Sequence, residues 1–221
     1  MKRIRVRAVI FDYGNVLSAP QGQTEIETMA SILNVSVADY LEAYWQFRVS
    51  YDEAALDPAD YWHQVSQRPS RSLTGEQIAT LVEVDSQSWS YPAPVLPQWA
   101  RELRAAGLKT ALLSNMPTSV RDHVLRCDWL PPFDQRTFSC EVRIAKPDQA
   151  IFQHCLIGLD VDPQEILFLD DRPENVQAAE TLGLHGIVYK TAHQAARDIS
   201  RGFDIPVPLV VTLDEGNEEN Q

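Results

Sequence analysis

From residue 94 onward, short and almost continuously apolar runs alternate with segments of helical spacing. The apolar runs lie at 108–114, 136–140, 165–170 and 185–190, and a further one lies at 5–11. Three segments of helical spacing, 94–107, 146–158 and 172–183, each end on a glycine where a left-handed C-terminal cap is expected: Gly107, Gly158 and Gly183. Strands that are apolar on both faces and are joined by helices predict an α/β fold, with a parallel Rossmann-like sheet flanked by helices.

Residues 19–93 have a different pattern, with apolar residues at helical spacing. Four N-terminal caps are expected there: Thr24 with Glu27, Ser36 with Asp39, Asp57 before Pro58, and Thr74 with Gln77. The stretch is rich in aromatic residues, most of which we expect to pack inward. The sequence therefore predicts a core domain of residues 1–18 and 94–213, an inserted helical-bundle cap of residues 19–93, an edge strand within 206–213, and a disordered tail of residues 214–221.

The composition restricts the partners. The 221 residues carry a formal net charge of −12 and no basic run, which argues against binding to nucleic acid or an anionic membrane. Cys127, Cys140 and Cys155 lack CxxC spacing, and no leader-like segment precedes them, so we expect reduced thiols in the cytoplasm. The expected partner is a small metabolite, and the expected assembly is a monomer or a homodimer.

Polar residues follow the predicted strands at the points where ligands bind in open parallel sheets. They are Asp12, Ser114 with Asn115, Lys146 before a helix, and Asp170 with Asp171. Two neighbouring carboxylates after an apolar strand repel each other unless a cation or hydrogen bonds hold them. The sequence therefore predicts one site at the carboxyl edge of the sheet, with acidic groups and a lysine.

Four ordered motifs, "FDYGNVL", "LLSN", "AKPD" and "FLDDRPEN", resemble those of the haloacid dehalogenase (HAD) superfamily. The helical insertion is similar to the C1-type cap of its subfamily I, and the DxGNV form of the first motif is similar to a branch of glucose-1-phosphate phosphatases. The resemblance implies Asp12 as nucleophile, Ser114 as hydrogen-bond donor and Lys146 as balancing cation. It further implies Mg²⁺ held by Asp12, the Gly14 carbonyl, Asp170 and Asp171, with Asn175 supporting the loop, and a phosphate bound near Gly14, Asn15, Ser114, Asn115, Lys146 and Arg48.

These residue types suit a phosphatase. A carboxylate that attacks phosphorus forms an acyl phosphate and divides one difficult displacement into two easier ones. Attack on an anionic ester is opposed by repulsion, which Mg²⁺ and one lysine would offset. We therefore expect an Mg²⁺-dependent phosphatase acting on a small phosphorylated metabolite, with a sugar phosphate favoured.

Gly14 stands where many family phosphatases carry the aspartate that protonates the leaving group. One interpretation is a sugar phosphatase whose anomeric phosphate leaves easily. A second is a 2-haloacid dehalogenase, which needs neither an acid nor a metal and in which Arg48 receives the substrate carboxylate. A third is a catalytically inactive binding module with the same fold. General acid–base catalysis is worth about 10² to 10⁴-fold, so its loss slows hydrolysis without abolishing it.

The cap would close over the site and select the substrate. Arg48, Tyr51 and Trp45 are candidates for this role by chemical type, because arginine binds anions and aromatic rings stack on sugars. None of the histidines lies within a motif, so no histidine is assigned as the base: His63, His123, His154, His185 and His193.

Overall fold

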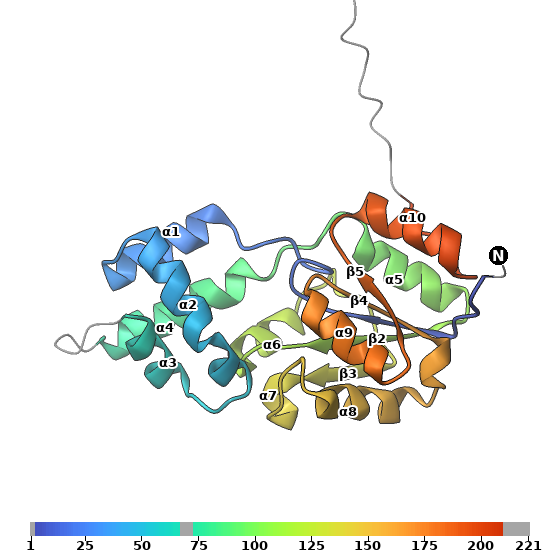
Figure 1. The fold of residues 1–221 in the computed structure, drawn as a ribbon. Coiled ribbons are helices and arrows are strands. Elements are labelled where there is room, and N and C mark those ends of the chain that lie inside the picture. The colour runs from blue at the N-terminus through green and yellow to red at the C-terminus, as the bar shows by residue number, and fades with distance from the viewer. Residues whose placement is uncertain (1–2, 67–72, 210–221) are drawn as a thin grey trace, which may run out of the picture.

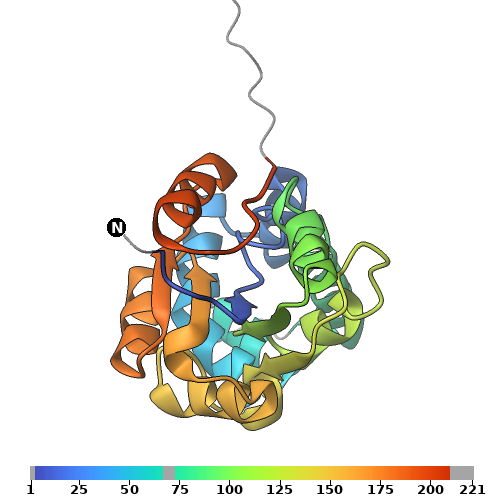
Figure 2. The same ribbon diagram turned by 90° about the vertical axis from the view of Figure 1, so that its right-hand side faces the viewer.

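The computed structural model describes residues 3–66 and 73–209, and these form a parallel five-stranded sheet with helices on both faces (Figures 1 and 2). The strands are β1 (Ala8–Phe11), β2 (Lys109–Ser114), β3 (Gln135–Phe138), β4 (Ile166–Asp170) and β5 (His185–Val188). Their order is β3-β2-β1-β4-β5. The predicted α/β fold with a Rossmann-like parallel sheet is confirmed, and each of the five apolar runs overlaps a strand.

Both faces of the sheet are buried, as the near-continuous apolar runs require. In β1, Val9 and Phe11 belong to one core cluster, whereas Ala8 and Ile10 belong to another on the opposite face. The first cluster includes residues of α5 (Leu96–Ala105), α6 (Thr118–Val124) and α10 (Ala192–Gly202). The second includes residues of α8 (Gln149–Leu159) and α9 (Pro173–Thr181). The short α7 (Ser139–Val142) follows β3, and a 3-10 turn, Pro163–Glu165, precedes β4.

In the described part of the stretch between β1 and α5, four helices form a body of their own beside the sheet (Figure 1). They are α1 (Gln23–Leu33), α2 (Val37–Asp52), α3 (Pro58–Val65) and α4 (Gly75–Ser88), and we call them the helical segment. Its core is a separate apolar cluster that contains Tyr40, Tyr44, Tyr51, Tyr61 and Trp62. Most aromatic residues of this stretch pack inward, as expected. The division of the chain into core and cap domains stays a prediction.

The helical segment is tied to the sheet body by hydrogen bonds at the C-terminal end of α2. Ser139 Oγ donates to the carbonyl of Asp52 at 2.6 Å, and the Ala145 amide donates to Glu53 Oε1 at 3.0 Å. The hydroxyls of Tyr51 and Ser119 lie 3.2 Å apart. The loop after α2 therefore holds the helical segment against the carboxyl edge of the sheet.

Two predicted helix ends differ from the structure. Thr24 lies inside α1, whose N-cap is Gly22, so the predicted cap at Thr24 is wrong. Gly158 lies inside α8, and Asp160 adopts the left-handed conformation at the C-cap with φ of 51°. Asp and Asn tolerate this conformation because their short polar side chains bond locally. Gly107 and Gly183 have φ of 86° and 90°, as predicted.

The other predicted caps are present. The side chains of Ser36, Asp57 and Thr74 accept hydrogen bonds from backbone amides of the helices they precede. No strand forms over residues 206–209, and the rest of the expected edge strand and the tail 214–221 lie outside the described residues. None of the helices in the described ranges is long and apolar enough to cross a membrane. Cys127, Cys140 and Cys155 are free.

We expect Thr74→Ala to lower the free energy of unfolding by about 1 kcal/mol, because it removes one half of a reciprocal capping box. Thr74 Oγ1 accepts from the Gln77 amide at 3.2 Å, and Gln77 Oε1 accepts from the Thr74 amide at 3.0 Å. Thr24→Ala is the matched control, because Thr24 is exposed inside a helix, where alanine is favourable. Urea denaturation measures both, and equal stability of the two variants would contradict the assignment.

Candidate active site

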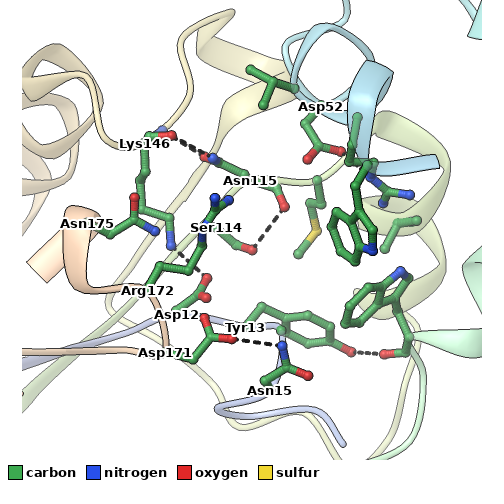
Figure 3. Close-up of a pocket in the computed structure, with 17 residues that line it drawn as sticks. Asp12, Tyr13, Asn15, Asp52, Ser114, Asn115, Lys146, Asp171, Arg172 and Asn175 are labelled. Carbon is green, nitrogen blue, oxygen red and sulfur yellow. Dashed lines mark hydrogen bonds and ion pairs between the residues drawn. The ribbon is translucent and has the colours of Figure 1, made fainter. Parts of the chain in front are cut away.

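The carboxyl edge of the sheet brings most of the predicted polar residues to one cavity, which Asp12, Ser114, Asn115, Lys146 and Asp171 line (Figure 3). Asp170 is fully buried and does not line the cavity. Asp12 follows β1, Ser114 ends β2, and Asp170 ends β4. The Asp12 amide donates to the Leu169 carbonyl at 2.9 Å, which continues the pairing of β1 with β4 past the last paired residues. Strand order reverses between β1 and β4, where ligand sites lie in such sheets. The cavity volume is about 410 Å³.

The ammonium of Lys146 joins two of these strand ends. Lys146 Nζ lies 2.7 Å from Asp12 Oδ1, 2.7 Å from Asp170 Oδ2 and 3.0 Å from the Leu113 carbonyl. The lysine side chain is almost completely buried. Burial alone would lower the pKa of Lys146, but the charges of Asp12 and Asp170 raise it above its ordinary value. The lysine therefore remains a cation at neutral pH.

Asn115 positions Lys146. Its side-chain nitrogen donates to the Lys146 carbonyl at 2.9 Å, and its side-chain oxygen accepts from the Lys146 amide at 2.8 Å. Both polar atoms of this side chain thereby hold the backbone of the loop that precedes α8. Contact of Asn115 with a substrate, which the sequence predicts, stays a prediction.

Three carboxylates form an acidic cluster beside the lysine. Oxygens of Asp12, Asp170 and Asp171 lie within 4.8 Å of one another. Asp170 accepts from Asn175 Nδ2 at 3.0 Å and from the Arg172 amide at 2.9 Å. Among the described residues, Asn175 Oδ1 is one of four buried side-chain polar atoms without a partner. A set of carboxylate and amide oxygens fits a hard divalent cation such as Mg²⁺.

Burial controls the charge of this cluster. It raises the pKa of Asp12 to about 7, although the Lys146 ammonium acts in the opposite direction. It also raises the pKa of Asp171, whose Oδ2 accepts from Asn15 Nδ2 at 2.8 Å. One buried lysine faces three carboxylates, so further positive charge would stabilise their ionised forms.

Ser114 and Asn15 complete the polar floor. Ser114 is buried, and its hydroxyl donates a long hydrogen bond, 3.5 Å, to the Asn115 carbonyl. A hydrogen bond of this length is weak. Asn15 has φ of 59°, a conformation that asparagine adopts more readily than most residues, and this turn directs its side chain to Asp171. Both side chains line the cavity with Gly14.

Gly14 is covered by an indole ring that the sequence analysis did not assign to the site. A Cβ atom at Gly14 would lie 3.3 Å from Cζ3 of Trp89. Trp89 Nε1 donates to the Tyr44 hydroxyl at 3.1 Å, and the Tyr13 hydroxyl donates to the Trp89 carbonyl at 2.6 Å. The ring is therefore held from two sides. Trp89 follows α4, far from every motif in the sequence, and no sequence signal marked it.

Arg48 lines the cavity, but its guanidinium is already paired. Nε lies 2.7 Å from Asp52 Oδ1, and Nη1 lies 3.1 Å from Asp85 Oδ2 and also donates to the Tyr44 hydroxyl. All of these partners belong to the helical segment and are buried. Burial raises the pKa of Asp52 to about 6 against the opposing effect of Arg48. Binding of a substrate anion by Arg48 stays a prediction.

Trp45 and Tyr51, the two aromatic candidates for substrate selection, differ in their position relative to the cavity. Trp45 lines the cavity and is half exposed, whereas Tyr51 is absent from the lining. Tyr51 stacks on Tyr61 with ring centroids 4.2 Å apart. Among the described residues, no histidine lines the cavity. The sequence did not predict Asp52 and Asp85 as the buried partners of Arg48. Charged residues of a helix usually face solvent, and their burial becomes evident only from the packing of the helices.

Comparison with known proteins establishes the family. A model described as haloacid dehalogenase-like hydrolase matches residues 6–183. This match covers most of the chain, which therefore belongs to the haloacid dehalogenase-like hydrolases and is an enzyme of that family.

Sequence relatives include both phosphatases and dehalogenases. Acyl-CoA dehydrogenase family member 10 of Mus musculus is 35% identical over 123 residues, which are 53% of this chain and only 11% of that protein. A sesquiterpene phosphatase of Aspergillus oryzae is 28% identical over 184 residues, covering 82% of this chain and 88% of that protein. (S)-2-haloacid dehalogenase 1 of a Pseudomonas species is 27% identical over 197 residues, covering 82% of this chain and 83% of that protein.

Solved structures share the fold. A predicted HAD-like family hydrolase of Porphyromonas gingivalis superposes with a TM-score of 0.67 at 23% identity, covering 89% of this chain and 97% of that one. A HAD family enzyme of Bacteroides thetaiotaomicron, solved with magnesium and inorganic phosphate, superposes with a TM-score of 0.61 at 20% identity, covering 84% and 94%. At these identities the likeness concerns the fold alone.

We expect Arg48→Met to lower the free energy of unfolding by about 3–5 kcal/mol, because it leaves two buried carboxylates without their cation. Arg104→Met is the matched control, since the Arg104–Asp134 pair is about one-third exposed and is worth about 0–1 kcal/mol. Chemical denaturation compares the two variants. A small loss for Arg48→Met, similar to the control, would contradict a structural role for this arginine.

We expect Gly14→Ala to cost about 1–3 kcal/mol of stability, because the added methyl group meets an indole ring that is held in place. Gly75→Ala is the matched control, since nothing lies within 4 Å of a Cβ there and the residue begins a helix. Thermal and urea unfolding report both. If the two alanine variants were equally stable, Trp89 would not be what restricts position 14.

Proposed function

We propose that this protein is an Mg²⁺-dependent phosphatase that hydrolyses the phosphate monoester of a small metabolite through an aspartyl phosphate on Asp12. The observation that carries the proposal is the arrangement around Lys146, where one buried ammonium lies 2.7 Å from Asp12 and 2.7 Å from Asp170, with Asp171 beside them. An anionic phosphate bound here needs positive charge, and this site combines a lysine with oxygen ligands suited to Mg²⁺.

Each residue of the floor has a part in this proposal. A carboxylate oxygen of Asp12 bonds to phosphorus while the bond from phosphorus to the ester oxygen breaks, and the leaving oxygen takes a proton from water. A second water molecule then cleaves the acyl phosphate, which releases inorganic phosphate and restores the carboxylate. Ser114 donates a hydrogen bond to a phosphate oxygen, and Lys146 balances the negative charge of the phosphate.

Asp12, Asp170, Asp171 and the Gly14 carbonyl would hold Mg²⁺, and Asn175 supports the loop through its bonds to Asp170. The bound cation supplies charge neutralisation for the transferring phosphoryl group. The proposal is supported by the phosphatase among the sequence relatives and by a structural neighbour solved with magnesium and phosphate.

The finer assignment follows the motifs. We propose subfamily I, with the helical segment acting as a C1-type cap, and a place beside the phosphatases that share the DxGNV motif. The three free cysteines fit the reducing cytoplasm, where we place the enzyme. Its assembly as a monomer or a homodimer stays a prediction. The sequence motif favours a sugar phosphate, but the proposed phosphatase activity does not depend on that preference.

A second candidate is a 2-haloacid dehalogenase, because a relative with this activity spans most of the chain. Halide displacement needs no proton donor at position 14. The acidic pair Asp170 and Asp171 weighs against it, since a metal-free displacement of halide has little use for two carboxylates near the nucleophile. Arg48, which would receive the substrate carboxylate, already bonds Asp52 and Asp85.

We expect Asp12→Asn to reduce Mg²⁺-dependent phosphate release by at least about 10³-fold, because an amide cannot form the acyl phosphate. The measurement is phosphate release from sugar, nucleotide and alkyl monophosphates, with Mg²⁺ and with EDTA. Asp122→Asn removes an exposed carboxylate outside the cavity and serves as the control. Turnover of haloacids without metal would support the dehalogenase instead, and the absence of any turnover would favour an inactive binding module.

A further inference from the structure

The cavity lining combines two kinds of side chain. Its polar floor carries Asp12, Ser114, Lys146 and Asp171. The rest of the lining includes Arg48, Asp52 and Arg172 together with five apolar side chains: Trp45, Val49, Trp89, Met116 and Val120. A phosphate held on the floor therefore directs the rest of its ester toward apolar groups.

Two of these side chains are exposed although they are apolar. Trp45 is 50% exposed and Val49 is 48% exposed. They lie four residues apart on α2, which places them side by side on one helical face, and that face borders the cavity. Among the large exposed apolar residues of the described ranges, they are the two that line the cavity. An exposed apolar pair inside a concave site is typical of a ligand contact.

The indole rings of Trp45 and Trp89 form a corner in the cavity lining. Their centroids lie 6.4 Å apart with an interplanar angle of 79°. Trp89 is fixed by its bond to the Tyr44 hydroxyl, which in turn donates to Asp85 Oδ1 at 2.7 Å. Trp89 also lies against Gly14, so an aromatic ring borders the place that a side chain at position 14 would take. A leaving group next to Asp12 therefore meets an indole face.

Polar partners for a hydroxyl-rich leaving group are scarce beside these apolar side chains. Arg48 bonds Asp52 and Asp85, and Asn115 uses both side-chain polar atoms on Lys146. A sugar lying against Trp45, Val49 and Trp89 would lose hydrogen bonds to water and would regain few of them there, which is costly. An alkyl chain loses none.

We propose that the site takes a phosphate monoester with an apolar alkyl chain as its leaving group, the chain lying against Trp45, Val49 and Trp89. This inference rests on the proposed phosphatase activity and narrows its substrate class. Trp45, Val49 and Trp89 then form the surface that binds the alkyl chain. Their contact with the chain excludes water and positions the phosphate for attack by Asp12. Trp45 and Val49 are specificity-determining residues in this arrangement.

The test is the chain-length dependence of hydrolysis. We expect kcat/KM to rise from ethyl through butyl and hexyl to octyl phosphate by about fourfold for each methylene that becomes buried, until the cavity is full. Glucose-1-phosphate should lie at least about tenfold below octyl phosphate. In Trp45→Ala and Val49→Ser the ratio of octyl to ethyl phosphate should fall by about tenfold. Both residues are half exposed, so these variants retain the fold.

Ile157→Ser is the matched control, because Ile157 is an apolar residue of α8 that is 80% exposed and does not line the cavity. It should keep the wild-type chain-length dependence. Binding of ethyl and octyl phosphonate, measured by calorimetry with Mg²⁺, gives a second readout, since their carbon–phosphorus bond is not hydrolysed. The octyl compound should bind more tightly to the wild type, and this preference should shrink in Trp45→Ala.

The outcomes separate this inference from the proposed function. Turnover of ethyl phosphate without chain-length dependence, or a preference for glucose-1-phosphate, would overturn the alkyl-chain inference and leave the phosphatase intact. Chain-length-dependent binding of phosphonates without turnover of any ester would overturn the phosphatase and support the chain-binding surface. Equal binding of both phosphonates would overturn the inference whatever the activity.

Discussion

The site depends on one buried ammonium placed between two carboxylates. Lys146 Nζ bonds Asp12 from β1 and Asp170 from β4, so a loop joins the ends of two neighbouring strands. Breaking such a network by removing one member leaves an uncompensated buried charge. Asn115 contributes from β2 by holding the Lys146 backbone through both of its side-chain polar atoms. The sheet, the loop and the charges of the floor therefore form one unit.

Gly14 lies between the polar floor of the cavity and the ring of Trp89. A residue with a side chain there would press against Trp89, whose ring is fixed by Tyr44 and the buried Asp85. The lack of a side chain at position 14 therefore goes together with an indole ring at short distance. Position 14 offers no side-chain acid, and Trp89 adds apolar surface to the cavity beside it.

The helical segment contains a buried cluster of charges that also borders the cavity. Arg48 is buried between Asp52 and Asp85 and lies close to the rings of Tyr44 and Tyr51. Buried ion pairs often contribute little to stability but fix one arrangement of the helices. Arg48 pairs with Asp52 and Asp85 inside the helical segment. Trp45 and Val49, on the same helix α2, are exposed and line the cavity.

The sequence by itself determined the parallel sheet, because strands buried on both faces need near-continuous apolar runs, and glycines such as Gly107 mark left-handed helix ends. It also placed Asp12, Ser114, Lys146 and Asp170 at one edge, since parallel strands end together. It could not distinguish Thr24 from a true cap, because Thr24 and Thr74 have equivalent local patterns. Only tertiary structure decided that Trp89 covers Gly14 and that Arg48 is paired, because these contacts join residues far apart in the chain whose side-chain directions depend on how the helices pack.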